Sequence, residues 1–167
     1  MHSHRGATST NSFSVDLNNC NCTALRKATR RLSHFYDSVL APAGLKSTQY
    51  SILSEISRRA DTPPTMRELA DALVMDRSTL GHNLRPLERD QLVALESTAT
   101  DRRLKHVVLT RKGRTAFAES KKLWCTAQAH FEATFGITKA AELRGILLGI
   151  AADSALAQPV PTSASIR

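Results

Sequence analysis

Residues 77–83, with the sequence RSTLGHN, carry side chains that suit contact with phosphates and base edges. Hydroxyl, amide, imidazole and guanidinium groups are those with which a helix contacts the sugar-phosphate backbone and reads bases in a major groove. The solvated face of an ordinary amphipathic helix has a similar composition, so this segment takes its meaning from its neighbours. The candidate contact residues are Arg77, Ser78, Thr79, His82 and Asn83.

A strongly basic segment lies further along the chain. Residues 102–122 contain eight Lys or Arg and one acidic residue, Glu119, and so account for nearly all of the formal net charge of +8. Concentrated positive charge is typical of a surface that binds a polyanion, although the sequence pI of about 9.9 also fits a membrane-surface protein. Arg102, Arg103 and Lys105 lie in or beside the polar stretch STATDRR at 97–103, and we expect them to contact DNA.

Two short helices are expected to position the first group. Thr65 and Glu68 have the spacing of a capping box, which predicts that a helix begins near Met66. Asp76 can cap a second helix, and Pro86 predicts a kink in its last turn, beyond the polar face. Apolar residues at helical spacing give each helix a buried side: Leu69, Ala70 and Leu73 in the first, and Leu80, Leu84 and Leu87 in the second.

A hairpin is expected to carry the basic residues next to these helices. Leu92, Val93 and Leu95 have a strand pattern, residues 97–103 form a polar tip, and a second apolar run follows. That second run consists of Val107, Val108 and Leu109. Two helices followed by a basic hairpin have the layout of a winged helix that lies on DNA.

Four short motifs in this stretch resemble the MarR family of bacterial transcriptional regulators. They are MDRSTL at 75–80, RPLERD at 85–90, DRR at 101–103 and LTRKG at 109–113, and the resemblance extends over roughly residues 20–153. The resemblance implies a dimeric winged-helix protein whose second helix enters the major groove. It also implies that Arg103 reaches the adjacent minor groove while Asp101 holds that arginine in place.

The chain departs from the family pattern at two sites that bear on DNA binding. Gln91 stands where the family usually has a glycine, which predicts a cost of about 1 kcal/mol if the positive φ is kept. Gly81 and His82 stand where Thr-Arg is common, so one potential base-reading arginine is missing. We therefore expect the operator sequence and affinity to differ from those of relatives that carry the arginine.

Further amphipathic helices are expected on both sides of the winged helix. Apolar residues recur at three or four residue spacing over 25–39, after the potential caps Asn19 and Asn21, and again over 47–59. Two more stripes follow, one over 117–135, which includes Cys125, and one beginning after Thr138. One domain of this size has little use for so many stripes unless a second copy covers some of them, so a homodimer is favoured over a monomer with a larger helical core.

These patterns define a fold class and a domain organisation. We expect a mainly α-helical winged helix-turn-helix with a small β-hairpin wing, dimerised through its N- and C-terminal helices. The domain should span 18–156, with its DNA-binding core at 47–114. Polar composition predicts disordered tails at 1–17 and 157–167.

Two cysteines near the start of the first long helix are candidates for sensing an oxidant. The positive end of a helix lowers the pKa of a thiol, and Arg26 and Lys27 add positive charge to Cys20 and Cys22. Cys22 falls where the organic-hydroperoxide-sensing branch of the family keeps its reactive cysteine, and Tyr36 where that branch has a supporting tyrosine. A second tyrosine of that branch would fall at Ser47. An inert thiol near a dimer contact is the alternative for Cys22.

A small ligand and a metal ion are alternative signals. Many members of the family release DNA when an aromatic acid binds between the dimerisation helices and the winged domain, and such a pocket needs aromatic walls and a cation. Its walls would be Phe35, Tyr36, Tyr50 and Ile52, with Arg30, Arg31 or His34 as the cation. Metal sensing would use Cys20, Cys22, His2, His4 and His34, but Cys-x-Cys without a second spaced pair favours it only weakly.

Other functional classes receive little support from the sequence. It contains no GxSxG, HExxH or phosphate-binding glycine loop, and we expect no enzyme and no cofactor. It shows no signal peptide and no membrane span, which predicts a cytoplasmic protein with reduced thiols. The favoured function is a sequence-specific DNA-binding regulator, a repressor released by a small molecule or an oxidant. The alternatives are an architectural DNA-binding protein without an effector and, further behind, a thiol oxidoreductase that uses Cys20 and Cys22.

Overall fold

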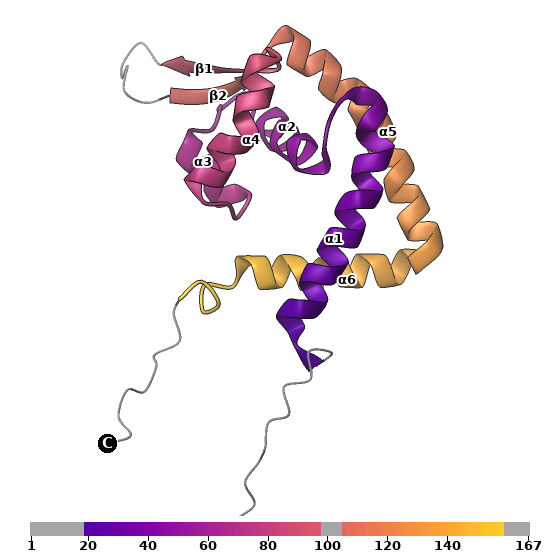
Figure 1. Ribbon diagram of the computed structural model, residues 1–167. Helices are drawn as coiled ribbons and strands as arrows, with labels where there is room; N and C mark the ends of the chain where they lie inside the picture. The colour runs from indigo at the N-terminus through magenta and orange to yellow at the C-terminus, as the bar shows by residue number, and fades with distance from the viewer. Residues whose placement is uncertain (1–18, 98–104, 159–167) are drawn as a thin grey trace, which may run out of the picture. The chain divides into compact units, whose positions relative to one another are not determined.

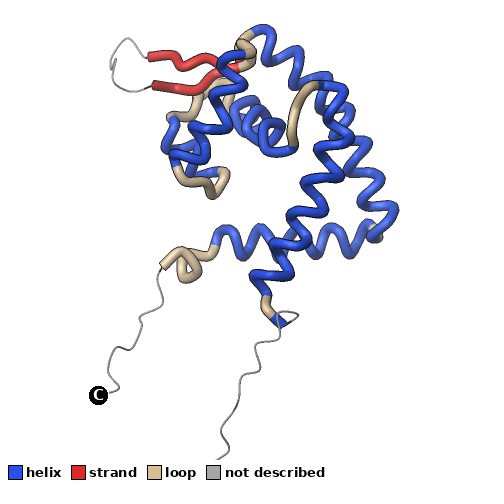
Figure 2. The backbone as a smooth tube through the Cα atoms, viewed as in Figure 1, coloured by secondary structure: helices blue, strands red, loops and turns tan. Residues whose placement is uncertain are grey.

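The computed structural model describes residues 19–97 and 105–158, and the chain divides into two compact units, residues 1–34 and 35–167. The predicted tail at 1–17, residues 159–167 of the predicted tail at 157–167, and the tip of the hairpin lie outside the described residues. Within the described part, most residues are in helices, and two strands form one antiparallel hairpin (Figures 1 and 2). The elements are α1 (Asn21–Leu40), the short 3-10 helix η2 (Ala41–Ala43), α2 (Ser47–Arg58), α3 (Met66–Ala72), α4 (Arg77–Arg89), β1 (Val93–Ser97), β2 (Lys105–Leu109), α5 (Arg111–Phe135) and α6 (Ile137–Ala152).

Helix α1 passes from the first unit into the second between His34 and Phe35. Its first turn differs from the sequence prediction that Asn19 or Asn21 caps it. The Sγ atom of Cys20 instead accepts a hydrogen bond from the backbone N–H of Thr23 at 3.5 Å. A thiol therefore takes the position that a hydroxyl or carboxylate oxygen usually fills at a helix start.

The core of the second unit is made by α2, α3, α4 and the hairpin. Most of the apolar positions that the periodicity predicts are at most 8% exposed. Leu73 of the loop after α3 is half-buried, and Leu95 of β1 is 38% exposed, so the predicted burial of these two side chains was wrong. The cluster contains Leu45, Ile52, Leu53, Ile56, Leu69, Ala70, Leu80, Leu84, Leu87, Leu92, Val93, Val107 and Leu109.

The hairpin joins this core through its backbone as well as its side chains. Strands β1 and β2 pair antiparallel with Val93 opposite Leu109 and Ser97 opposite Lys105. On the other side of β2, His106 forms a bridge with Thr65, and the N–H of Val107 donates to the carbonyl oxygen of Pro64 at 2.8 Å. The hairpin is thereby attached to the segment that leads into α3.

Helices α5 and α6 differ in how much of their apolar surface is covered. Tyr50 of α2 stacks on Trp124 of α5 with a centroid distance of 5.9 Å and also contacts Phe117. Helix α6 starts at Ile137, directly after Gly136 and before the stripe that is predicted after Thr138, and Ala140 is its only buried residue. Its exposed apolar side chains include Ile137, Ile146, Leu148 and Ile150.

Candidate nucleic-acid interface

Helix α4 presents the predicted polar face. Leu80, Leu84 and Leu87 are at most 2% exposed, so the opposite side of the helix is turned to solvent. Arg77, Ser78, Thr79 and His82 are exposed as predicted. Asn83 is half-buried, and its Nδ2 donates to the carbonyl oxygen of Thr79 at 2.8 Å.

Asp76 caps α4 and also orients two of the predicted contact residues. Its carboxylate accepts the N–H of Thr79 at 2.7 Å, the hydroxyl of Ser78 at 2.5 Å and the hydroxyl of Thr79 at 2.6 Å. The hydrogen bonds from the hydroxyls of Ser78 and Thr79, followed by that from the Thr79 backbone, hold the pKa of Asp76 well below its usual range. Because both hydroxyl hydrogens are directed at the carboxylate, Ser78 and Thr79 present lone pairs outward. Such oxygens can accept from the amino group of cytosine or adenine in a major groove.

One residue on this face was missed from the sequence. Arg85 is exposed and lines a shallow hollow together with Ser78, Thr79, His82 and Asn83. The spacing of 78, 82 and 85 is i, i+4 and i+7, which places these residues along one side of a helix. That spacing could have identified Arg85, and it supplies a cation on a face whose family arginine is missing.

The second half of α4 remains helical through its proline. Pro86 lies inside the helix, which continues to Arg89. The loop behind it contains Gln91 with a φ of 58°, so the left-handed backbone predicted for the family's glycine position is retained without the glycine. Val74, in the corner between α3 and α4, also has a positive φ, of 51°.

A set of contacts at the base of the wing ties the end of α4 to the start of α5. The hydroxyl of Thr110 donates to the carbonyl oxygen of Gln91 at 2.6 Å and accepts the N–H of Gly113 at 2.9 Å, which caps α5. The Nζ of Lys112 donates to the carbonyl oxygen of Asp90 at 2.9 Å. A Cβ atom on Gly113 would lie 1.8 Å from the carbonyl oxygen of Leu92, so only glycine permits this approach. The LTRKG motif is thus a structural joint that sets where the hairpin leaves the core.

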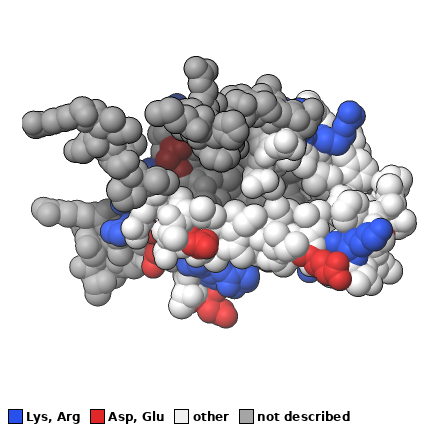
Figure 3. Space-filling model, turned by 90° about the horizontal axis from the view of Figure 1, so that it is seen from below, with Lys and Arg blue, Asp and Glu red and all other residues white. Residues whose placement is uncertain are grey.

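The basic residues of segment 102–122 that the structure describes are solvent-exposed. Lys105 begins β2 at the outer end of the hairpin, whereas Asp101, Arg102 and Arg103 lie outside the described residues. The exposed cations of α5 are Arg111, Lys112, Arg114, Lys121 and Lys122. The face of the molecule in Figure 3 instead shows Lys, Arg, Asp and Glu scattered over uncharged surface.

The three cysteines occupy unlike environments. Cys20 is half-buried, and hydrogen bonds from the side chain and the backbone N–H of Thr23 lower its pKa. Cys22 is exposed. Cys125 is also exposed, so its predicted place within an apolar stripe was wrong: it faces solvent while Trp124 packs on Tyr50.

The aromatic residues predicted to line an effector pocket are packed against α5. Tyr36 donates its hydroxyl to Oε1 of Gln128 at 2.8 Å, and burial, followed by the nearby Glu132 carboxylate, raises its pKa. Phe35 contacts His130 with a centroid distance of 5.4 Å. Tyr50 is buried, whereas Arg30 and His34 are exposed and belong to the other unit.

The described residues also bear on a metal site and on a membrane span. In these residues, no group of three His, Cys, Asp or Glu side chains is placed to hold a metal ion. His2 and His4 lie outside them. No helix among the same residues is long and apolar enough to cross a membrane.

Comparison with known proteins places this arrangement among transcriptional regulators. A sequence model of the MarR family matches residues 43–104. The chain is 35% identical to the M. tuberculosis transcriptional regulator MosR in complex with DNA, with a TM-score of 0.73 over 84% of this chain and 99% of that one. It is 27% identical to the transcriptional repressor CouR bound to a 23-mer DNA duplex, with a TM-score of 0.73 over 81% of this chain and 94% of that one.

A second structure of CouR, a protein of Rhodococcus jostii RHA1, contains p-coumaroyl-CoA. It is 25% identical to this chain, with a TM-score of 0.73 over 84% of this chain and 97% of that one. A search of curated proteins gave no match. These similarities confirm the winged helix that the motifs predict.

Proposed function

The chain belongs to the MarR family of DNA-binding transcriptional regulators, and we propose that it is a homodimeric repressor that binds a pseudo-palindromic operator. The observation that carries the proposal is the exposed polar face of α4, whose hydroxyls are oriented by Asp76. An oriented face loses less side-chain entropy on binding than a mobile one. The similarity to DNA-bound MosR and CouR supports the same orientation of α4 toward DNA.

We assign separate roles to the residues of this surface. Ser78 and Thr79 accept hydrogen bonds from base amino groups, and His82 and Asn83 contact base edges beside them. Arg77 and Arg85 contact phosphates on either side of the groove. The wing contributes Arg102, Arg103 and Lys105, with Arg103 in the minor groove and Asp101 holding it.

Dimerisation through the terminal helices supplies the two-fold symmetry that a pseudo-palindrome requires. Ile137, Ile146 and Leu148 of α6 are 72%, 61% and 63% exposed. Contact of these apolar side chains with water is unfavourable, and a second copy of the chain would remove it by covering them. Two recognition helices then have to lie about 34 Å apart to enter successive major grooves.

The proposal is tested by footprinting the purified protein on the DNA upstream of its own gene. A repressor protects one defined two-fold site, and a reporter fused to that promoter is silenced when the protein is expressed. Uniform protection without a defined site would instead identify an architectural DNA-binding protein. A reporter that is activated would contradict the repressor role.

For the signal, we propose oxidation of a thiol at the start of α1 by an organic hydroperoxide in the cytoplasm. The Thr23 hydrogen bonds stabilise the Cys20 thiolate, and Cys22 lies two residues further on in the first turn. A thiolate attacks the peroxide, takes one oxygen to become a sulfenate and releases the alcohol. The added oxygen, or a disulfide to another thiol, alters the dimerisation helix and the spacing of the recognition helices.

A gel-shift titration with cumene hydroperoxide tests this signal on the wild type, Cys20→Ser and Cys22→Ser, with Cys125→Ser as the matched control. We expect the wild type and Cys125→Ser to leave the operator while at least one of the N-terminal variants stays bound. If all four proteins behave alike, the thiol proposal is wrong. A small ligand, such as the one that CouR binds, then becomes the candidate signal.

A further inference from the structure

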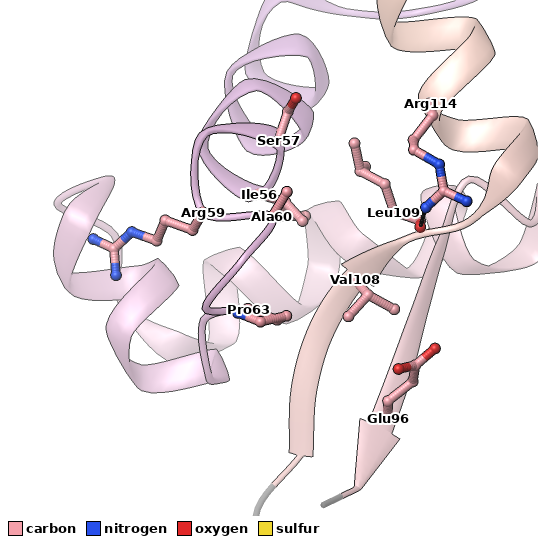
Figure 4. A pocket seen from close by; sticks show the side chains of 9 residues that line it. All are labelled: Ile56, Ser57, Arg59, Ala60, Pro63, Glu96, Val108, Leu109 and Arg114. Carbon is pink, nitrogen blue, oxygen red and sulfur yellow. Dashed lines mark hydrogen bonds between the residues drawn. The ribbon is translucent and has the colours of Figure 1, made fainter.

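A hollow of about 300 Å³ lies at the root of the wing and takes no part in the DNA surface described above. Its walls come from the end of α2, the loop that follows it, both hairpin strands and the first turn of α5 (Figure 4). The lining residues are Ile56, Ser57, Arg59, Ala60, Pro63, Glu96, Val108, Leu109 and Arg114. The volume is at the lower end of the range for small-molecule sites, which restricts the occupant to a short molecule.

The polarity of the hollow is divided. Its middle is apolar, formed by Ile56, Pro63 and Val108, and Ile56 is only 2% exposed. Figure 4 shows Arg114 on one side of Val108 and Glu96 on the other, whereas the Arg59 side chain points away from the hollow. Arg59 is also paired with Glu55 at 2.7 Å. The charges available to a ligand are therefore one guanidinium and one carboxylate, at opposite ends of an apolar wall.

The separation of the two charges follows from the register of the hairpin. Glu96 lies opposite His106, and Nη1 of Arg114 donates to the carbonyl oxygen of Leu109 at 2.8 Å. Three residues of extended strand separate these two levels, which is a distance of roughly 10 Å. The remaining N–H groups of the Arg114 guanidinium are donors suited to a carboxylate.

We propose that this hollow binds a short amphoteric molecule, with a carboxylate on Arg114, an ammonium group on Glu96 and an apolar chain between them. Such a ligand connects β1 to α5 across the root of the wing through the guanidinium N–H groups that Leu109 does not use. It therefore changes the angle of the hairpin relative to the core and weakens operator binding. This regulatory consequence rests on the proposed repressor function, whereas the binding itself does not.

Isothermal titration calorimetry on the full-length protein without DNA tests the site, with 6-aminohexanoate as the probe. Hexanoate and hexylamine each lack one charge, and β-alanine has both charges without the long spacer. We expect 6-aminohexanoate to bind more tightly than all three. No heat from 6-aminohexanoate, or equal affinity for β-alanine, would overturn the proposal.

Two charge-neutralising variants locate the bound molecule. Glu96→Gln should weaken 6-aminohexanoate binding about tenfold or more while leaving hexanoate unaffected or tighter, and Arg114→Gln should weaken both. Glu119→Gln, an exposed carboxylate elsewhere on α5, is the matched control and should change neither. Arg114→Gln can fail to fold because it loses its hydrogen bond to Leu109. In that case Glu96→Gln, at an exposed position, still tests the site, because it should weaken 6-aminohexanoate binding without weakening hexanoate binding. Equal effects of Glu96→Gln on both ligands would overturn the site.

Fluorescence anisotropy on the footprinted operator then separates the two levels of the proposal. Saturating 6-aminohexanoate should raise the operator Kd of the wild type about fivefold or more and that of Glu96→Gln much less. An unchanged wild-type Kd would overturn the regulatory role of the hollow. Failure of the ligand-free protein to bind any operator would instead overturn the proposed function, because the calorimetry is independent of DNA.

Discussion

Helices α4 and α6 both expose a long face, but the two faces have opposite chemistry. Helix α4 buries Leu80, Leu84 and Leu87 and exposes hydroxyls, an imidazole and guanidinium groups. Helix α6 buries only Ala140 and exposes isoleucine and leucine side chains. The polar face of α4 is stable in water as it stands, whereas the apolar face of α6 lowers its free energy only when another apolar surface covers it. One face therefore suits a reversible charged ligand and the other a permanent partner.

The largest expected effect separates the buried side of α4 from its exposed side. Leu84→Ala should lower the free energy of unfolding by about 2–5 kcal/mol, because it leaves a cavity in the core. Thr79→Ala, the matched change on the exposed side, should abolish specific DNA binding while the protein stays folded. Urea denaturation and fluorescence anisotropy measure the two effects. If Thr79→Ala unfolds the protein and Leu84→Ala does not, the assignment of the two sides is inverted.

A substitution in the joint at the base of the wing should lower folding stability nearly as much as Leu84→Ala does. Gly113→Ala places a Cβ atom against the backbone of Leu92, and rotation of a side chain cannot remove this clash. We therefore expect the free energy of unfolding to fall by about 3 kcal/mol. Gly145→Ala is the control, because a Cβ there meets no atom within 4 Å in the same chain. Thermal unfolding followed by circular dichroism compares the two. Equal melting temperatures for the wild type and Gly113→Ala would show that the joint can shift without cost.

Substitutions on the apolar face of α6 should dissociate the dimer without unfolding the chain. Covering one leucine side chain is worth about 1.5–3 kcal/mol, so Leu148→Glu should weaken self-association strongly, and twice over in a symmetric dimer. Thr138→Glu, at an exposed polar position of the same helix, is the control. Sedimentation equilibrium gives the dimer Kd of each variant. A Leu148→Glu protein that sediments as the wild type does would exclude this face from the dimer.

The sequence predicts the features of α4 that depend on neighbouring residues, and it misses those that depend on tertiary packing. The caps at Thr65 and Asp76 and the leucine spacing of α4 are local, so counting residues places them correctly. The hydroxyl orientation by Asp76 was missed because a cap pattern specifies the backbone N–H but not what else the carboxylate accepts. The hollow at the wing root was missed because it joins α2, the hairpin and α5, which only tertiary packing brings together. Exposure of Cys125 likewise depends on which side of α5 packs on Tyr50.

Arginine substitutions sharpen the comparison on the DNA side. Arg103→Ala and Arg85→Ala should each weaken operator binding by about 1–3 kcal/mol and reduce the dependence of the binding constant on salt by about one phosphate contact. Arg58→Ala is the control, because this exposed arginine of α2 pairs with Glu55 in the same helix. Anisotropy titrations over a range of salt concentrations give both quantities. An unchanged affinity and salt slope for Arg103→Ala would remove the wing from the mechanism.

The smallest effect is expected from acid, and it tests whether the α4 face is held in place by Asp76. A carboxyl group whose pKa is lower in the folded protein stabilises the fold fully above its unfolded pKa, near 3.8, and loses that contribution as the pH falls toward the folded value. Stability measured by urea denaturation should therefore fall less steeply below pH 4 in Asp76→Asn than in the wild type. Asp71→Asn is the matched control, because it neutralises an exposed aspartate of α3 that caps no helix. At neutral pH Asp76→Asn should also bind the operator more weakly, because an amide no longer collects the hydroxyl hydrogens of both Ser78 and Thr79. Parallel acid profiles for the wild type and Asp76→Asn would mean that the carboxylate does not hold this face. The orientation of the Ser78 and Thr79 hydroxyls could then not be attributed to Asp76.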